Sequence, residues 1–413
     1  MAAVTGGRRY RLFLAGQAVS LLGDGLAILA IPLLVLQMTR SPLAAALASA
    51  PRTIGYLLVG LPAGPLVDRM DPWRVLIGAD VVRCAVFVAL FTLTRAHAGT
   101  IAVILVLAFV AGAAGVFFET ALAIATRDLY RGQALVGANS FLETANQTSL
   151  VIGPAIVGLL AVALGMNAAL LVDAATFVVS LTTLAGTRRR TPPIPRPPRQ
   201  QVPLRTQWRD GVRCLASSPV ILSFAVLQVV INLCLAVEKL IVFFARDYLG
   251  AASWLVGVAV AGGGLGGVAG AAIAPYLTAR IAPVRLALAA SAMIGIGLCV
   301  TGSAPDAWWL AAGNAVLVWA TVVASIVIRT LRQHLVPRDL LGRVTSTVRS
   351  IVLATTPLGA VLAGMVTQML SGNPRLVFLG AGMVVAASAP IAWLSGLRHH
   401  DATGLDTASD AAC

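Results

Sequence analysis

Charged side chains are scarce in this chain. They make up 11% of its 413 residues, whereas a soluble globular protein carries about 25%. Hydrophobic residues make up 58%, and the mean hydropathy is +0.89. This composition excludes an ordinary soluble domain. It indicates an integral membrane protein whose long apolar runs are spanning helices.

Lysine and histidine are almost missing. The single lysine, Lys239, lies in an apolar run, so the chain has no Gly-x-x-x-x-Gly-Lys-Ser/Thr phosphate loop, and ATP coupling within this chain is excluded. The glycine-rich stretch "AGGGLGGVAG", residues 261–270, instead predicts close helix packing. The four histidines are scattered or terminal, which disfavours a metal site or a membrane enzyme: His97, His334, His399 and His400.

Twelve apolar segments are long enough to cross a bilayer, which takes about 20 residues. They predict an all-α membrane protein of twelve transmembrane helices in two pseudo-symmetric six-helix bundles. The approximate limits of the segments are 11–38, 43–67, 73–94, 100–125, 137–164, 167–187, 219–245, 253–278, 284–303, 307–331, 344–370 and 375–397.

The longest connection divides the twelve segments into six and six. We expect an N-terminal bundle over residues 1–187 and a C-terminal bundle over residues 219–397. Between them, residues 188–218 are basic and rich in proline, which predicts an extended linker. Residues 398–413 are expected to form a tail.

The distribution of arginine predicts the orientation. If the N-terminus is cytoplasmic, 21 arginines lie in inner segments and four in outer loops, as the positive-inside rule requires. Both termini and the linker are then cytoplasmic, and arginine and alanine usage favours a bacterial cytoplasmic membrane. The linker is interpreted as an anchor near anionic lipid, because it lacks the interleaved aromatics of a nucleic-acid-binding segment.

The two halves resemble each other after their second spans, where "DRMDPWRVL" and "ARIAPVRLA" stand. Duplicated six-helix halves are typical of secondary transporters, with the substrate site between the halves near the midplane. Three residues recur at a constant offset of 211: Arg69, Pro72 and Arg74 as Arg280, Pro283 and Arg285.

The stretch "GPLVDRMDPWR", residues 64–74, resembles the loop motif of the major facilitator superfamily, Gly-x-Leu-x-Asp-Arg-x-Gly-Arg-Lys/Arg. Asp71 replaces the second glycine, and Pro72-Trp73 is unusual. The residues that fit are Gly64, Leu66, Asp68, Arg69 and Arg74.

This resemblance implies that Asp68 braces one conformation by bridging to a neighbouring helix end and an arginine. Arg349 and Arg127 are the expected partners. The alternative is an ordinary charged turn.

A second stretch, "SLVIGPAIVG" at residues 149–158, looks like the Gly-Pro motif of proton-coupled exporters in this superfamily. Gly153, Pro154 and Gly158 fit, whereas Ser149 and Val157 replace glycines. The alternative is close helix packing without any exporter-specific meaning.

Over nearly the whole chain the sequence is similar to the bacterial exporter branch that includes macrolide and siderophore efflux proteins. "SLLGDGLAILAIPLLVLQMTRSPLA", "ADVVRCAVF" and "LRQHLVPRDLLGRVTSTVRSIVLATTPLGAVLAG" carry this resemblance. One departure concerns the fourth span, "IAVILVLAFVAGAAGVFFE". It lacks the arginine that drug–proton antiporters usually have there, so that residue's role cannot be transferred.

Ionisable residues inside spans are costly and mark candidate functional sites. Asp24 and Arg52 both lie near mid-membrane on adjacent spans, where we expect them to pair and line the central cavity. The alternative is a purely structural ion pair. Asp173 is expected to be an interfacial residue near the outer end of its span. The remaining charges are expected to form an inner gate network: Asp80, Arg83, Glu119, Glu143, Arg329 and Arg349.

Glu238 and Lys239 stand side by side near the outer end of the seventh span. Neighbouring helical residues point about 100° apart and do not pair with each other. One is therefore expected to face the cavity, where a carboxylate binds protons or a cationic substrate. The equally weighted alternative is an outer gate pair.

These features predict a monomeric transporter that exports hydrophobic or amphipathic small molecules, such as a drug, antibiotic or secondary metabolite, by alternating access. Protons are the expected counter-ion, so a proton gradient drives transport without any bound cofactor. The lipid bilayer, protons and the small molecule are the expected partners, with no nucleic acid. The alternatives are a proton-coupled solute importer of the same fold and, less favoured, a membrane enzyme.

Overall fold

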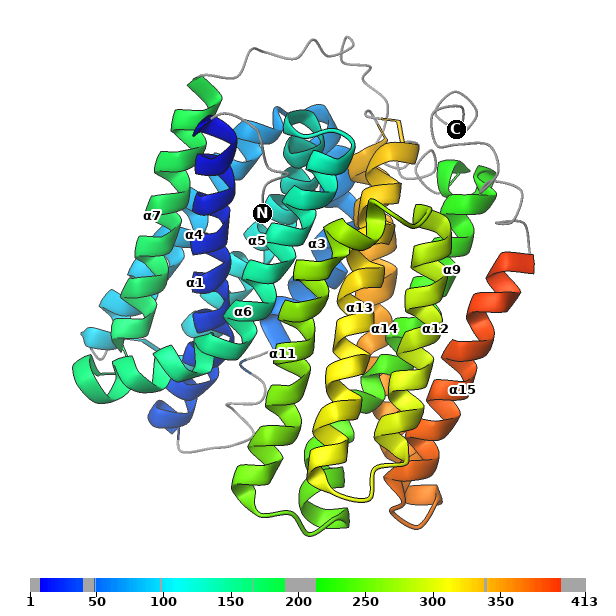
Figure 1. Ribbon diagram of the computed structural model, residues 1–413. Coiled ribbons are helices and arrows are strands. Elements are labelled where there is room, and N and C mark those ends of the chain that lie inside the picture. Colours follow the sequence, from blue (N-terminus) through cyan, green and yellow to red (C-terminus); the bar gives the residue numbers. More distant parts are fainter. Residues whose placement is uncertain are drawn as a thin grey trace. The chain divides into compact units, whose positions relative to one another are not determined.

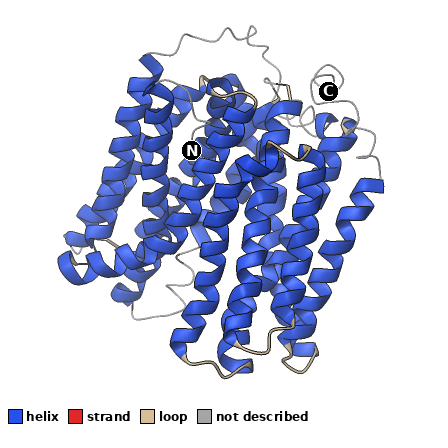
Figure 2. Cartoon of the chain, in the orientation of Figure 1, coloured by secondary structure: helices blue, strands red, loops and turns tan. Residues whose placement is uncertain are grey.

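A computed structural model describes residues 8–39, 48, 50–96, 99–165, 167–189, 213–337 and 340–394. This described part is built from helices and contains no strand (Figure 2). Residues 190–212 of the expected linker and all of the expected tail lie outside it.

The described part of the first half of the chain contains six long helices, one for each expected span. Local signals place several of their ends. Asp71 caps the helix that begins at Pro72, where its side chain accepts a hydrogen bond from the backbone N–H of Trp73. Thr100 caps the helix that begins at Ile101. The helices are α1 (Arg8–Thr39), α3 (Ala50–Arg69), α4 (Pro72–Arg95), α5 (Ile101–Leu129), α6 (Gln133–Leu164) and α7 (Asn167–Arg189).

The second half again follows the expected spans. Pro283 begins α12 as Pro72 begins α4, so the repeated Pro–Arg sequence has the same local structure in both halves. Its helices are α9 (Pro219–Leu235), α11 (Ser253–Thr278), α12 (Pro283–Gly302), α13 (Ala307–Leu335), α14 (Leu341–Met369) and α15 (Pro374–Ala392).

The seventh span is not one regular helix. After α9 it continues as a 3₁₀ turn (Ala236–Leu240), a short α10 (Ile241–Phe243) and a π turn (Phe244–Tyr248). Such departures from α geometry are often found at functional sites. The apolar run in the sequence did not predict them.

Ten segments within the described residues are long and apolar enough to cross a membrane, and the remaining two expected spans are the helices α3 and α6. The contacts divide the chain into two units. Unit 1 comprises residues 1–211 with 338–350, and unit 2 comprises residues 212–337 with 351–413. The first turns of α14 therefore belong to unit 1, although the rest of that helix belongs to unit 2.

Within unit 1, α7 packs against both α1 and α4, α1 also contacts α6, and α5 contacts α3 and α4 (Figure 1). Small residues let α1 approach its neighbours closely. A Cβ on Gly153 of α6 would lie 2.8 Å from the backbone oxygen of Gly25. The close-packing interpretation of the Gly-Pro stretch therefore has a physical basis at Gly153. The packing around Pro154 and Gly158 lies outside what the structure describes.

Within unit 2, α13 packs between α11 and α12, and α12 also contacts α15 (Figure 1). The glycine-rich stretch lies in the α11–α13 contact. A Cβ on Gly262, Gly266 or Gly270 would lie 2.0–2.6 Å from a backbone oxygen of α13. These glycines allow two helix backbones to touch, as the sequence predicted.

Candidate functional site

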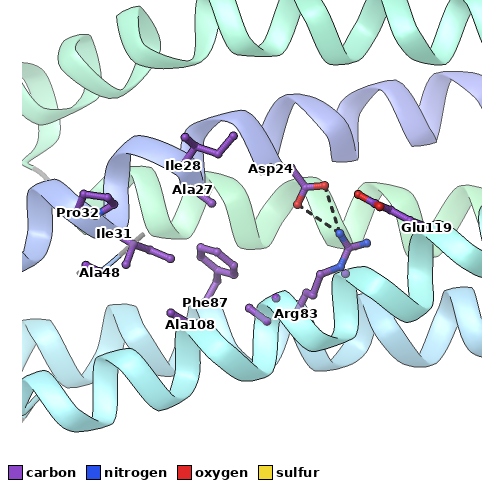
Figure 3. Close-up of a pocket in the computed structure, with 13 residues that line it drawn as sticks. Asp24, Ala27, Ile28, Ile31, Pro32, Ala48, Arg83, Phe87, Ala108 and Glu119 are labelled. Carbon is purple, nitrogen blue, oxygen red and sulfur yellow. Dashed lines mark hydrogen bonds and ion pairs between the residues drawn. The ribbon is translucent and has the colours of Figure 1, made fainter. Parts of the chain in front are cut away.

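Unit 1 contains a pocket of about 130 Å³ between α1, α4 and α5. Figure 3 shows its two ends to be chemically different. Asp24, Arg83 and Glu119 gather at one end, and apolar side chains, among them Ile31 and Phe87, line the rest. A pocket divided in this way fits an amphipathic molecule better than a uniformly polar one.

Asp24 on α1 faces Arg83 on α4 in this pocket. Both carboxylate oxygens lie 3.3 Å from Nη1 of Arg83. The Arg83 side chain is only 3% exposed, whereas that of Asp24 is 31% exposed. The carboxylate is therefore the group that a bound molecule meets first, and the guanidinium lies behind it.

Arg83 is enclosed on every side that the structure describes. Its Nη2 pairs with the fully buried Asp80 one turn earlier on α4. Its guanidinium carbon lies 4.1 Å from the ring centroid of Phe118 and 4.4 Å from that of Phe177. Aromatic faces attract a desolvated cation, so two rings and two carboxylates hold this charge inside the helix bundle.

The position of Arg83 bears on the arginine that the fourth span lacks. Phe118 belongs to α5, which is the fourth span, and Arg83 reaches its ring from α4, the third. A guanidinium thus lies against the fourth span although that span supplies none.

The structure changes two expectations about in-span charges. Asp24 pairs with Arg83, and the side chain of Arg52, its expected partner, lies outside the described residues. Asp80 and Arg83, expected in an inner gate network, instead belong to the group around Asp24. The sequence placed Asp24 and Arg83 at different depths because a residue's distance from the end of its own helix does not show how two helices are offset along each other, or how far a long arginine side chain reaches.

The expectation that Asp173 is interfacial was wrong. Its side chain is 0% exposed, and a Cβ on Gly23 would lie 2.3 Å from its Oδ1. It is therefore packed against α1 beside Asp24. A signal was available in the sequence, because polar residues recur on α7 at intervals of three and four, the spacing of one helical face. These residues are Asp173, Thr176, Ser180, Thr183 and Thr187.

Glu119 and Arg349 form an ion pair, so two members of the expected gate network do meet. Glu119 also lines the pocket. It therefore connects the pocket to the first turns of α14 in unit 1.

Asp68 binds the N-terminus of α14. Its two carboxylate oxygens accept hydrogen bonds from the backbone N–H groups of Gly342 and Arg343, each at 2.9 Å. The positive end of the helix dipole favours this contact. Nε of Arg343 lies 3.6 Å from Oδ2. The expected bridge to a helix end is present, and its arginine is Arg343, whereas Arg349 pairs with Glu119.

Glycine is needed on both sides of this contact. A Cβ on Gly342 would lie 2.3 Å from Oδ1 of Asp68, and a Cβ on Gly64 would lie 2.6 Å from the backbone oxygen of Gly342. The glycine at the start of the loop motif therefore has a steric explanation. The two arginines of the motif differ in exposure: Arg69 is half-buried and Arg74 is exposed.

Gly342→Ala is expected to lower the thermal unfolding temperature of the purified protein, even though alanine favours helix more than glycine by ~1 kcal/mol. The reason is that the new methyl group would displace Asp68 from the helix N-terminus. Gly115→Ala is the matched control, because a Cβ there meets nothing within 4 Å. An unchanged or higher unfolding temperature for Gly342→Ala would contradict this account.

Asp71, which replaces the usual glycine of the loop motif, has a role of its own. Its Oδ1 caps α4 through Trp73 at 3.1 Å, and its Oδ2 accepts a hydrogen bond from Arg188 at the end of α7, also at 3.1 Å. The Asp71 side chain therefore links the beginning of α4 to the end of α7 within unit 1.

Glu238 and Lys239 lie in the 3₁₀ turn of unit 2, where Glu238 is half-buried and Lys239 is exposed. They are not part of the unit 1 pocket. Among the described residues no group of three or more His, Cys, Asp or Glu is placed to hold a metal ion.

A sequence profile of the Major Facilitator Superfamily matches residues 13–348. The chain belongs to this superfamily, whose fold is the twelve-helix fold described above. The family and fold are those of multi-pass membrane transporters, not of enzymes.

Two curated relatives are exporters by name. The chain is 26% identical to the multidrug efflux pump Tap of Mycolicibacterium fortuitum, over 92% of this chain and 94% of that protein. It is 22% identical to macrolide efflux protein A of Streptococcus pyogenes, over 90% of this chain and 93% of that protein. The predicted resemblance to the exporter branch is thereby confirmed.

Solved structures with the same fold include a homologue of an iron transporter and a sugar:proton symporter. A bacterial homologue of the iron transporter ferroportin, in an outward-facing state, superposes with a TM-score of 0.76 at 18% identity, covering 95% of this chain and 99% of that one. The Escherichia coli fucose:proton symporter gives 0.74 at 13% identity, covering 92% and 98%. At these identities the likeness shows the fold alone.

Proposed function

We propose that this protein exports hydrophobic or amphipathic small molecules across the bacterial cytoplasmic membrane by proton antiport. The observation that carries the proposal is the divided pocket of unit 1, which has a half-exposed carboxylate at one end and apolar walls elsewhere. Such a pocket takes an apolar body and interacts with one charged or polar group on it. The names of the exporters to which the chain is similar support the outward direction.

The carboxylate gives a physical basis for coupling. Asp24 can be neutralised either by a proton or by a positive group on the transported molecule, and the two compete for the same oxygens. A site that holds one of them at a time exchanges them across the membrane when it opens alternately to each side. The positive charge of Arg83, which lies beside Asp24, offsets the charge of the ionised carboxylate.

The termini and the arginine-rich linker are proposed to be cytoplasmic, because that orientation alone satisfies the positive-inside rule. A monomer remains the expected state, as in the family generally. No bound cofactor enters the mechanism, since the proton gradient supplies the energy.

Transport by purified protein in liposomes tests the proposal and separates it from import. With an imposed pH gradient, a proton antiporter accumulates a radiolabelled macrolide or a fluorescent lipophilic dye on the acidic side, and a proton symporter accumulates its substrate on the alkaline side. Protein-free liposomes correct for passive trapping of weak bases. Accumulation on the alkaline side, or none beyond the protein-free level for either probe, would overturn the proposal.

Glu238→Gln is expected to weaken gradient-driven export or shift its pH dependence, and Lys239→Met to have a milder effect. Glu238 is half-buried in the 3₁₀ turn, whereas Lys239 is exposed and has a long stem that can reach outward. Parallel liposome assays of both variants across a range of pH test this. If Lys239→Met is the more damaging change, a basic gate or anion site replaces the proton-site interpretation of this pair.

A further inference from the structure

The charged end of the pocket belongs to a larger group of charged side chains, of which only Asp24 and Arg83 line the pocket. This group consists of Asp24 on α1, Asp80 and Arg83 on α4, and Asp173 on α7, all in unit 1. The group contains three carboxyl groups and one guanidinium. If all were ionised, this enclosed group would carry two negative charges. Charge buried without a partner is costly enough that a group takes up a proton instead.

Asp173 is the member of the group that forms no ion pair with any described residue. In the part of the chain that the structure describes, its carboxyl group accepts only from the hydroxyl of Thr176, at 3.4 Å to Oδ1, and its buried Oδ2 has no hydrogen-bond partner. Asp24 and Asp80 both pair with Arg83. The arrangement is the one expected for a protonated Asp173 beside two ionised neighbours.

One N–H donor of Arg83 is not used by Asp24 or Asp80. Its Nε is buried and has no hydrogen-bond partner among the residues that the structure describes, while Nη1 and Nη2 donate to Asp24 and Asp80. Phe177, whose ring lies against the guanidinium, stands one turn from Asp173 on α7. An unused donor and an unused acceptor therefore lie in one buried group, and their charges would attract each other if Asp173 lost its proton.

We propose that Asp173 is a proton-binding site, and that it passes its proton to Asp24 as Arg83 changes partner from Asp24 to Asp173. The O–H bond of Asp173 breaks and an O–H bond forms on Asp24, directly or through a water molecule. The guanidinium stays charged and Asp80 stays paired with it, so the net charge of the group does not change. Asp24, the half-exposed member, then releases the proton to the pocket.

The charged and titratable groups around Asp173 are consistent with this exchange. Asp24 on α1 and Arg83 and Cys84 on α4 interact electrostatically with Asp173, and Asp80 lies beside Arg83 on α4. Asp24 is the one carboxyl among them that opens to the pocket. The role of Asp24 in transport rests on the proposed antiport. The presence of a proton on Asp173 does not depend on that proposal.

Infrared difference spectroscopy of the purified protein tests the site without any substrate. At neutral pH the wild type should show the C=O band of a protonated buried carboxyl group, and Asp173→Asn should lack it. Asp80→Asn, a matched change in the same group, and Asp247→Asn, at an exposed position of unit 2, should keep the band. A band that is missing in the wild type, or unchanged in Asp173→Asn, overturns the proposal.

Transport gives the second readout. Asp173→Asn should reduce pH-gradient-driven accumulation of the macrolide probe about 100-fold, the scale of a lost proton-transfer group, and should remove its pH dependence. Exchange of labelled for unlabelled macrolide without a gradient should persist, because Asn imitates the protonated side chain. Loss of gradient-driven transport and exchange together would mark Asp173 as merely structural.

Two further outcomes are distinguishable. If Asp173→Asn does not insert, Asp173→Glu replaces it, and the carboxyl band should then shift in frequency; an unshifted band overturns the proposal. If the wild type shows the Asp173 band but no gradient-driven transport, the proposed antiport fails and the proton site stands.

Discussion

Asp24→Asn is expected to abolish pH-gradient-driven export while the protein still folds and inserts. The substitution removes the one carboxylate that the Arg83 group presents to the pocket, and with it the oxygens that exchange a proton for substrate. Folding should survive because Asp80 continues to neutralise the buried guanidinium. Accumulation in liposomes should fall about 100-fold or more.

Asp247→Asn serves as the control for Asp24→Asn, since it makes the same chemical change at an exposed position of unit 2. Insertion is checked by comparing the amount of monodisperse protein recovered in detergent. Normal export by a normally expressed Asp24→Asn variant would remove Asp24 from the mechanism.

Arg83→Met is expected to cause the largest loss of stability of any single change in unit 1. Removing one partner of a buried ion pair leaves the other uncompensated, which costs ~3–5 kcal/mol. Here Asp80 would be left fully buried without its cation, and the rings of Phe118 and Phe177 would lose the charge that they enclose. We expect little folded protein, with a strongly lowered thermal unfolding temperature in detergent.

A second substitution separates lost charge balance from lost packing. The double variant Arg83→Met with Asp80→Asn removes the stranded carboxylate, so much of the lost unfolding temperature should return. Transport should not return, because the guanidinium that holds Asp24 is still missing. A double variant no more stable than Arg83→Met alone would show that Arg83 acts through shape and not through charge.

The loop motif illustrates what a local sequence pattern can predict and what it cannot. Gly64 and Asp68 were recognisable in the sequence because the motif is contiguous, and so was the expectation that Asp68 contacts a helix end. The identity of that end, the first turn of α14, lies 274 positions away in the chain. No local pattern specifies a contact over that separation, and Arg343, the arginine beside Asp68 in the structure, was not among the expected partners.

The charge group at the end of the pocket illustrates the same limit. Asp24 was identified from the sequence because a carboxylate stands out in an apolar run. Its partner was sought on the adjacent span, whereas the structure pairs it with Arg83 of the third span. Asp173 was expected to be interfacial because it lies near the end of a span. That distance along the chain does not show which neighbouring helix covers the side chain.

The membrane environment, the number of spans, the repeat of the two halves and the superfamily could all be predicted from the sequence, because each rests on composition or on residues close together in the chain. Which charges meet depends on how the helices pack. A helix presents its residues in every direction, and only the packing of α1, α4 and α7 turns Asp24, Asp80, Arg83 and Asp173 toward one another. Once these helices pack, the cost of burying charge makes the four residues act as one group.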